Sequence, residues 1–376
     1  MFKSFLQGGF ECSTHRRKDG KRLDLIAATR HDVFALEDYR ALADLKIWTV
    51  RDGVRWHVIE ARPRHYDFSS VVPMLRAAQT TGTQAIWDLH HFGWPDDIDI
   101  FSAEFVQRFG QFASAFATLL KNETDGTAFI CPVNEMSFLS WAGGETAYVN
   151  PFATGRGSEL KTQLVLATIA AIQAIRGVLP GARIVICEPA IHIVASPLRP
   201  QDKAAAEGYR LSQFQALDML TGKISPQLHG RRDYGEIIGV NYYSNNQWID
   251  HGRTLQQGDP LYRPFREILR EFYDRYGRPL FVSETGIEGD RRPAWLTYVA
   301  DEVMAARESG VPVEGICLYP MVNHPGWDDD RHCHNGVLDY PGRDGHREMY
   351  EPLAREIEKQ RRRFSPENLL AQAANA

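Results

Sequence analysis

The sequence predicts an α/β protein with a single (β/α)8 TIM barrel, and three observations favour this fold. Short apolar runs alternate with longer amphipathic runs along nearly the whole chain. Most of the short runs are apolar throughout, which is typical of parallel strands covered on both faces. The length of 376 residues is also suitable, because such barrels commonly take about 250 residues or more.

Eight runs are predicted to form the strands of the barrel. Side chains of a strand alternate between its two faces, so a run that is apolar at nearly every position must be covered on both sides. In chain order the predicted strands are SFLQGGFE (4–11), TVRDGVRW (49–56), QAIWDLHH (84–91), TAFICPVNE (127–135), ARIVICEP (182–189), IIGVNYY (237–243), PLFVSETG (279–286) and VEGICLYP (313–320).

Helical periodicity fills the intervals between these strands. The run over 102–123 repeats phenylalanine on one face, with Ser102 as a candidate N-cap. The run over 158–179 carries an aliphatic stripe and stops at Pro180 and Gly181. The two stripes are Phe105, Phe109, Phe112 and Phe116, and Leu160, Leu164, Ile172, Ile175 and Leu179. Further helices are expected near 33–46, 69–81, 203–221, 261–276, 293–309 and 346–363.

A doubly wound open sheet is the alternative fold for alternating strands and helices. It usually carries a glycine-rich phosphate turn after its first strand, and QGGFECS lacks the spacing G-x-G-x-x-G. We therefore expect one barrel domain over 1–364 and a C-terminal tail over 365–376 that need not be ordered. The long loops 136–156 and 321–345 are rich in Gly, Trp, Asp and His, and such loops tend to be functional.

Composition and charge argue against several classes of protein. A net charge of −5 without a basic cluster argues against a nucleic-acid partner, and no cationic amphipathic face suggests a membrane surface. No run approaches the roughly twenty apolar residues of a membrane helix, and the first residues include no apolar stretch long enough for a signal peptide. The five cysteines are odd in number and widely spread, so we expect reduced thiols in a cytoplasmic protein. The sequence does not indicate the oligomeric state.

Polar or aromatic side chains follow the apolar body of the predicted strands. Barrels of this kind carry out their chemistry at the carboxyl ends of the strands, where these side chains would gather. A single glutamate at such an end is more often a structural ion-pair partner, but titratable or amide groups at seven of the eight ends favour an active site. The residues are Glu11, Arg55, His90, His91, Asn134, Glu135, Glu188, Asn241, Tyr242, Tyr243, Glu284 and Tyr319.

Glu135 and Glu284 would face each other across the mouth of such a barrel. They end the fourth and seventh predicted strands, which lie three steps apart on a ring of eight. Two carboxylates that flank one space suit the hydrolysis of a glycosidic bond, in which one donates a proton and the other attacks the anomeric carbon. Their surroundings must then separate the two pKa values.

The neighbouring residue types are consistent with that division of roles. We expect Arg55 to reach Glu284 and keep it charged, and Tyr243 to donate a hydrogen bond to the same carboxylate. Amide, imidazole and carboxylate groups can bind sugar hydroxyls, and an indole offers a flat stacking surface. For these roles the sequence offers Asn134, His91, Glu11 and Trp327.

Taken together, the chain resembles the clan A glycoside hydrolases, most closely family 1, the retaining β-glucosidase group. Five segments carry the resemblance: CPVNEMSF, LFVSETG, GVNYYS, GVRWHVIE and LHHFGWP, the last with Phe92 where the family has Trp. The resemblance implies that Glu135 is the acid/base and Glu284 the nucleophile. It further implies site roles for Arg55, His91, Asn241 and Tyr243.

Two further segments match the family more faintly. QGGFEC offers Glu11 where the family has a sugar-binding glutamine. In ICLYPMVNHPGW, the pair Tyr319-Pro320 stands where the family has Trp followed by a cis peptide. The family's acidic residue after the eighth strand has no clear match, although one of the aspartates over 328–330 could replace it.

No metal site is predicted. His90 and His91 are adjacent in a strand and point to opposite faces, so they cannot easily bind one ion. The segment DDDRHCH (328–334) has the composition of a metal-binding tract, but its spacing matches no zinc pattern, and we interpret it as a polar loop. Glu188 either helps to bind substrate or pairs with a nearby base.

The functional prediction is a retaining β-glycosidase that acts by double displacement on a small carbohydrate or glycoside, without a cofactor. Glu284 would form a glycosyl-enzyme, and Glu135 would protonate the leaving oxygen and then deprotonate a water. One alternative is a carbohydrate-binding protein without turnover, which would not need the pair of glutamates. Another is a transglycosidase, for which the same residues would serve. The sequence identifies neither the sugar nor the aglycone.

Overall fold

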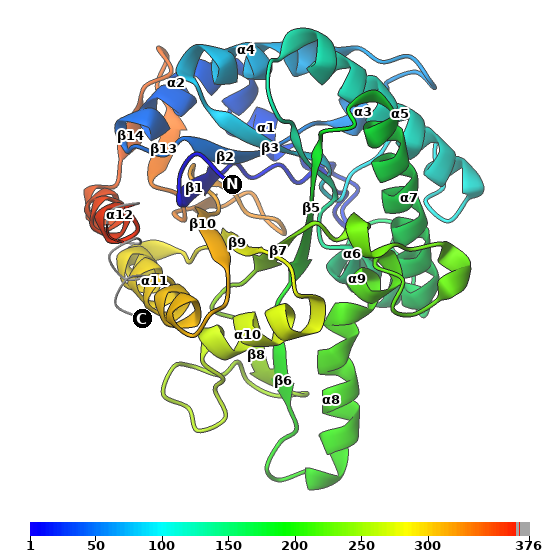
Figure 1. The fold of residues 1–376 in the computed structure, drawn as a ribbon, viewed down its shortest axis with the longest axis vertical. Coiled ribbons are helices and arrows are strands. Elements are labelled where there is room, and N and C mark those ends of the chain that lie inside the picture. The colour runs from blue at the N-terminus through cyan, green and yellow to red at the C-terminus, as the bar shows by residue number, and fades with distance from the viewer. Residues whose placement is uncertain (366–367, 369–376) are drawn as a thin grey trace.

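The barrel predicted from the sequence is confirmed by a computed structural model, which describes residues 1–365 and residue 368 (Figure 1). Each of the eight predicted runs contains one strand of a closed barrel. The strands are β1 (Leu6–Gly9), β2 (Thr49–Gly53), β3 (Gln84–His90), β4 (Phe129–Val133), β5 (Arg183–Pro189), β7 (Ile237–Asn241), β9 (Leu280–Thr285) and β10 (Val313–Leu318). The tail predicted over 365–376 lies almost wholly outside the described residues and stays a prediction.

Neighbouring barrel strands are parallel, and each pairs with the barrel strands before and after it in the sequence. Every residue of β2, β4, β7 and β9 is buried, as the continuous apolar runs require. Side chains fill the barrel interior, as expected for a packed core rather than a pore. One cluster of buried side chains consists of Ile86, Phe129, Cys131, Val185, Cys187, Ile237 and Phe281. Phe2 packs against Phe129 and Phe281 of this cluster.

The helices surround the barrel (Figure 1). They are α2 (His31–Asp44), α4 (Val72–Thr81), α5 (Ala103–Glu123), α7 (Gly157–Val178), α8 (Lys203–Leu211), α9 (Gln215–Leu220), α10 (Phe265–Tyr276), α11 (Arg292–Glu308) and α12 (Glu351–Arg363). The phenylalanine stripe of α5 is fully buried, and Ser102 caps that helix by accepting a hydrogen bond from the Phe105 N–H. Both expectations for this helix are therefore confirmed.

Three helix predictions differ from the structure. The helix expected over 203–221 is divided by the turn η4 (Ser212–Phe214) into α8 and α9. The one expected over 261–276 begins only at Phe265, because Pro264 is extended and fits the start of a helix. The one expected over 346–363 begins at Glu351, since residues 347–349 form a strand instead.

The two long loops contain short regular elements. The segment 136–156 includes α6 (Met136–Leu139) and the π-helix η2 (Ser140–Glu145). The segment after β10 forms two small antiparallel sheets, β11 (His324–Pro325) with β12 (His332–Cys333) and β13 (Leu338–Pro341) with β14 (Arg347–Met349). The other short elements are α1 (Leu25–Ala28), α3 (Trp56–Ile59), η1 (Phe68–Ser70), η3 (Pro200–Asp202), η5 (Pro226–Leu228), η6 (Arg232–Tyr234) and η7 (Gly289–Arg291).

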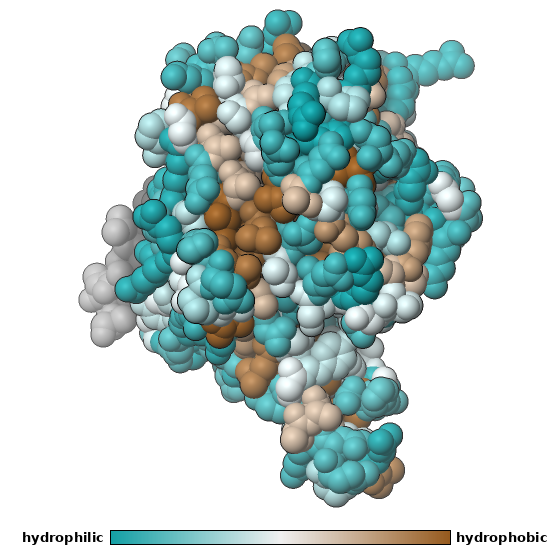
Figure 2. Space-filling view, turned by 90° about the vertical axis from the view of Figure 1, so that its right-hand side faces the viewer, coloured by the Kyte–Doolittle hydropathy of each residue, from teal (hydrophilic) through white to brown (hydrophobic). Residues whose placement is uncertain are grey.

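An extension projects from the barrel below β7 and α10 in Figure 1. It contains α8 and the parallel pair of β6 (His192–Val194) and β8 (Gln247–Ile249). Figure 2 shows the same extension at its lower end, and on this face apolar side chains occur in patches between hydrophilic ones. Among the described residues, no helix has the length and hydropathy needed to cross a membrane.

Candidate active site

The carboxyl ends of the barrel strands border one cavity of about 860 Å³, a volume typical of small-molecule sites. Eight of the ten predicted site residues line it. Asn241 does not line the cavity but contacts Glu135, and Arg55 lies elsewhere. The eight lining residues are Glu11, His91, Asn134, Glu135, Tyr243, Glu284, Tyr319 and Trp327.

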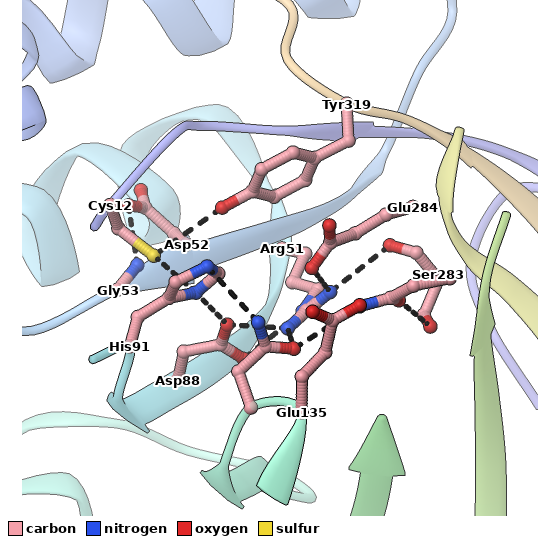
Figure 3. A network of polar contacts seen from close by, with 12 residues as sticks. Cys12, Arg51, Asp52, Gly53, Asp88, His91, Glu135, Ser283, Glu284 and Tyr319 are labelled. Carbon is pink, nitrogen blue, oxygen red and sulfur yellow. Dashed lines mark hydrogen bonds and ion pairs between the residues drawn. The ribbon is translucent and has the colours of Figure 1, made fainter. Parts of the chain in front are cut away.

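Glu284 lies in β9 and is held by two donors, of which Figure 3 shows Arg51. Arg51 donates from Nη1 to Oε1 at 2.6 Å, and the Tyr243 hydroxyl donates to Oε2 at 2.8 Å. A carboxylate that accepts one charge-assisted and one neutral hydrogen bond is stabilised in its ionised form. The arrangement suits a group that must be charged before substrate arrives.

Glu135 follows β4 and has a different environment. Its backbone is in the left-handed region, with φ of 44°, which is uncommon outside glycine and is often found at functional sites. Its N–H donates to the Cys187 carbonyl at 2.9 Å, so pairing with the neighbouring strand β5 helps to maintain this conformation. Asn241 donates to Oε1 at 2.8 Å, and no arginine or lysine is paired with this carboxyl among the described residues.

Burial raises the pKa of both carboxyl groups, but by different amounts. Burial and the nearby charge of Glu284 raise the pKa of Glu135 well above its ordinary value. Burial also raises the pKa of Glu284, but Arg51 and His91 act in the opposite direction. The pKa of Glu135 is therefore raised further than that of Glu284, so Glu284 is the first of the pair to lose its proton.

Arg51 is the cation that the sequence interpretation missed. It is fully buried in β2 and bonds to both oxygens of Asp88, from Nε at 3.0 Å and Nη2 at 2.6 Å. Nη2 also donates to Asn134 Oδ1 at 2.6 Å. Figure 3 shows its guanidinium beside Glu284 and Asp88. It thus holds three side chains, those of Asp88, Asn134 and Glu284, around the floor of the cavity.

The expected contact between Arg55 and Glu284 is wrong. Arg55 forms ion pairs with Asp24 at 3.1 Å and Asp32 at 2.9 Å. Strand β2 ends at Gly53, so Arg55 lies two residues beyond the strand. It belongs to the segment that leaves the barrel for α3 and does not point toward Glu284.

His91 and Asn134 line the cavity, but much of their hydrogen-bonding capacity is used within the chain. His91 Nδ1 lies 3.0 Å from Asp88 Oδ2, where a protonated nitrogen donates to the carboxylate. Asn134 Nδ2 then donates to His91 Nε2 at 3.1 Å. These hydrogen bonds therefore hold both side chains in place at the floor of the cavity without any contribution from a ligand.

Glu11 adds a third carboxylate to the cavity. Its Oε1 accepts hydrogen bonds from the N–H of Ser13, at 2.9 Å, and from the Ser13 hydroxyl. Burial opposes ionisation, but His91, His324 and the Ser13 hydrogen bonds outweigh it and lower the pKa of Glu11. The result is an ionised acceptor at the cavity wall, suited to hydroxyl or other donor groups.

The acidic replacement expected within residues 328–330 is not found at the cavity. Asp328 accepts from the Tyr148 hydroxyl at 2.8 Å, and Asp330 pairs with Lys21 at 2.6 Å. None of the three aspartates lines the cavity, whereas Glu288, which follows β9, does. Glu288 is paired with Arg331 at 2.5 Å.

Aromatic side chains form the upper walls of the cavity. Trp327 packs against His15, Phe92 and Phe138, at ring-centre distances of 4.6, 5.7 and 6.0 Å. Trp141 continues this wall from the π-helix and is 41% exposed, so its ring is accessible. The other wall includes Tyr209 and Trp248, which come from the extension. The sequence interpretation missed these three aromatic residues, and only the richness of loop 136–156 in Trp and Gly pointed toward one of them.

Glu188 fits neither of its two expected roles. It is buried and does not line the cavity, and Lys161 contacts Gln215 at 2.9 Å without reaching Glu188. Its Oε2 accepts from the Ser137 N–H at 3.1 Å, while Oε1 has no hydrogen-bond partner among the described residues. Burial raises the pKa of Glu188 to about 7.

Cys12, Asp88 and His91 lie close enough together to suggest a metal site on the cavity floor, but they do not fit one. Both oxygens of Asp88 are bonded to Arg51, and burial raises the pKa of the Cys12 thiol well above its ordinary value. A metal would have to displace the guanidinium and remove the proton from the thiol. His90 points away from the cavity, toward the rings of Trp94 and Phe105, as its opposite orientation to His91 requires.

Comparison with solved structures confirms that the fold is that of family 1 β-glycosidases. A family 1 β-glucosidase from Thermotoga maritima superposes with a TM-score of 0.77 at 13% identity, covering 95% of this chain and 98% of that one. A β-glycosidase from Pyrococcus horikoshii gives a TM-score of 0.78 at 18% identity, covering 99% of this chain and 97% of that one. At these identities the likeness concerns the fold.

Sequence comparison gives a more limited match. A beta-galactosidase from Sulfolobus acidocaldarius is 27% identical over an alignment of 178 positions, and the match covers 38% of this chain and 36% of that protein. The matched part therefore spans about a third of that relative. No protein-family model matches the chain.

Proposed function

We propose that the chain is a retaining β-glycosidase in which Glu284 is the nucleophile and Glu135 the acid/base. The observation that carries the proposal is the unequal treatment of two glutamates that line one cavity. Arg51 and Tyr243 bind Glu284, whereas the Glu135 carboxyl accepts a hydrogen bond only from the neutral Asn241 amide among the described residues. A retaining glycosidase needs one ionised and one protonated carboxyl group in these roles.

In the first step, Glu284 attacks C1 of the sugar, and Glu135 gives its proton to the departing glycosidic oxygen. A covalent glycosyl-enzyme forms, and the aglycone leaves as an alcohol. Negative charge disappears from Glu284 as the ester forms, so the pKa of Glu135 falls. Glu135, now ionised, then takes a proton from the incoming water, and the water attacks C1 to restore Glu284.

The spacing of the two carboxyl groups decides between retention and inversion. Retention requires about 5–5.5 Å, and inversion leaves room for an additional water. A short chain of contacts connects the two groups and supports the closer spacing. Arg51 bonds Glu284 and Asn134, and Asn241 Nδ2 lies 3.3 Å from Asn134 Oδ1 and 2.8 Å from Glu135 Oε1.

The substrate that we propose is a small β-linked glycoside. Ionised Glu11 supplies an acceptor for sugar hydroxyls, and Trp327 and Tyr319 supply apolar faces near the catalytic pair. The cavity is larger than one monosaccharide needs, and Trp141, Tyr209 and Trp248 suit a flat aglycone. Known relatives in fold and sequence are named β-glucosidase and beta-galactosidase, so glucosides and galactosides are the first candidates.

A panel of nitrophenyl glycosides in both anomeric forms would test the proposal. We expect hydrolysis of β-glycosides, release of the β-anomer as first product by NMR, and loss of activity in Glu284→Gln. A binding protein without turnover would bind the same glycosides but hydrolyse none. Equal activity of Glu284→Gln and the wild type would remove the nucleophile assignment, and an α-anomer as first product would rule out retention.

Transfer to an acceptor other than water is the second candidate, favoured by the aromatic walls above the catalytic pair. An alcohol held between Trp141 and Trp248 could attack the glycosyl-enzyme in place of water. Product analysis with and without added alcohols separates the two reactions. Glycoside products that dominate at low alcohol concentration would indicate a transglycosidase, and free sugar alone would indicate a hydrolase.

A further inference from the structure

The segment 328–334, interpreted from the sequence as a polar loop, brings two histidines to one face of a short strand. His332 and Cys333 form β12, and alternation along an extended chain directs His332 and His334 to the same side. Cys333 is buried on the opposite side. Asp339, in strand β13 of the other small sheet, completes a group of three potential ligands whose donor atoms lie within 4.8 Å of one another.

One atom of this group is without a hydrogen bond although it is enclosed. His332 Nε2 lies 3.0 Å from Asp339 Oδ1, yet the two atoms are not aligned as donor and acceptor. No other partner for this nitrogen exists among the described residues. A buried polar atom without a partner costs free energy, and its lone pair can instead bind a metal ion.

Asp339 is oriented by contacts that leave one of its oxygens free. Its Oδ1 accepts from the Tyr340 N–H at 2.8 Å and from Asn323 Nδ2 at 3.1 Å. Within the part of the chain that the structure describes, Oδ2 accepts no hydrogen bond. Hydrogen bonds that hold a ligating carboxylate in place are a common feature around bound metals.

We propose that His332, His334 and Asp339 bind one divalent transition-metal ion, and that zinc fits this site best. Two imidazoles and a carboxylate are ligands that zinc prefers, at about 2.0–2.2 Å. Bringing all three donor atoms to such distances from one ion requires side-chain shifts of under about 1 Å, since the donors already lie within 4.8 Å of one another. His334 is exposed, so an ion can enter from solvent, and water can occupy the fourth position.

The ion would fasten a segment that forms part of the cavity wall. The backbone carbonyl of His334 accepts from the Gly289 N–H at 2.8 Å, in the loop after β9 that also carries Glu288. The next residue, Asn335, lines the cavity and contacts His324 Nε2 at 2.9 Å. A metal that joins β12 to β13 therefore stabilises the wall near the catalytic glutamates, and this role is independent of the proposed reaction.

Direct metal binding tests the proposal. The untagged chain, freed of metal by a chelator, is titrated with zinc chloride by calorimetry and with cobalt chloride by visible absorption. We expect one ion per chain, with an intense cobalt spectrum typical of low coordination number. Affinity should fall at least about 10-fold in His334→Ala and in Asp339→Asn, which is a loss of about 1.4 kcal/mol or more.

His251→Ala is the matched control, because His251 is also exposed and lies on a turn outside this group. Its zinc affinity should equal that of the wild type, and circular dichroism should show that all three variants are folded. The proposal is overturned if the wild type binds no zinc, or if His334→Ala and Asp339→Asn bind as tightly as His251→Ala. In that case His332, His334 and Asp339 are neighbours that hold no metal ion.

Discussion

Arg51 Nη1 lies 2.6 Å from Oε1 of Glu284, and the arginine side chain is completely buried beneath the cavity. The same guanidinium binds Asp88, so one cation is shared by two carboxylates. Removing one partner of a buried ion pair leaves an uncompensated charge and commonly costs about 3–5 kcal/mol. Arg51 therefore contributes both to the ionisation of Glu284 and to the stability of the barrel.

The first prediction concerns Arg51 and its near neighbour Arg55. Arg51→Lys should keep the charge but lose the contacts to Asp88 and Asn134, and kcat/KM should fall at least about 100-fold. Arg55→Lys should leave kcat/KM within about 2-fold, because Arg55 pairs with Asp24 and Asp32 away from the cavity. Steady-state kinetics and thermal melting of both variants provide the check. Equal effects of the two substitutions would contradict the assignment of Arg51.

The difference between these two arginines shows how far the sequence can be interpreted. Short and mostly apolar runs located all eight strands. The polar side chains at the ends of these runs pointed to Glu135 and Glu284 as the candidate catalytic pair. Residues 51 and 55 have the same parity, so alternation alone cannot choose between them. The two arginines are distinguished only by the end of β2 at Gly53, which leaves Arg51 in the strand and Arg55 outside it. The position of a strand end depends on the packing of the whole barrel and is difficult to predict from sequence.

Residues contributed by segments outside the barrel could not be placed from the sequence. Trp248 reaches the cavity because β8 pairs with β6, although the paired residues His192 and Gln247 are 55 positions apart in the chain. Trp141 does so because a π-helix follows β4. Neither element has a local pattern that specifies its position, since tertiary contacts fix both.

Tyr243 supplies the second prediction. Tyr243→Phe removes the hydroxyl that donates to Glu284 Oε2 at 2.8 Å. A hydrogen bond to a charged group is worth about 1.5–3 kcal/mol, so kcat/KM should fall about 10- to 100-fold. Because the lost bond favours the ionised form, the pKa of Glu284 should rise, and the acidic limb of the pH profile should move to higher pH. An unchanged acidic limb would show that Tyr243 does not act on the ionisation of Glu284.

Glu135 supplies the third prediction, which concerns the basic limb. Its pKa is raised by burial and by Glu284, so activity should fall with rising pH as Glu135 loses its proton. Glu135→Gln should abolish this limb and slow nitrophenyl glycosides strongly. Substrates with a dinitrophenyl leaving group, which needs no proton, should be affected much less in the first step. If both classes of substrate lost activity equally, Glu135 would not be the general acid.

A buried histidine far from the chemistry supplies the fourth prediction. His31 lies between Asp38, at 2.7 Å, and Asp52, at 2.8 Å. Burial lowers its pKa, but the two carboxylates outweigh burial and raise it to about 9. Because the folded pKa exceeds the unfolded value of about 6.5, this contribution is fully present below pH 6.5 and is lost as the pH rises through 9.

The corresponding change in the free energy of unfolding is about 3 kcal/mol between those pH values, from a difference of about 2.5 pKa units. Urea unfolding of the wild type at several pH values should show this decline, and His31→Gln should lack it. His90→Gln is the control, since burial lowers the pKa of His90 to about 3 and the ring stays neutral over this range. A wild type with no decline would mean that His31 is not charged in the folded protein.

The central claim, that Glu284 becomes covalently bonded to the sugar, can be tested by trapping the intermediate. A 2-deoxy-2-fluoro β-glycoside with a dinitrophenyl leaving group slows the release of the sugar more than its capture. Mass spectrometry of the intact protein should then show one added sugar per chain, and digestion should locate it on the peptide that contains Glu284. A protein that turns over β-glycosides but carries no adduct, or carries it on another residue, would contradict the account.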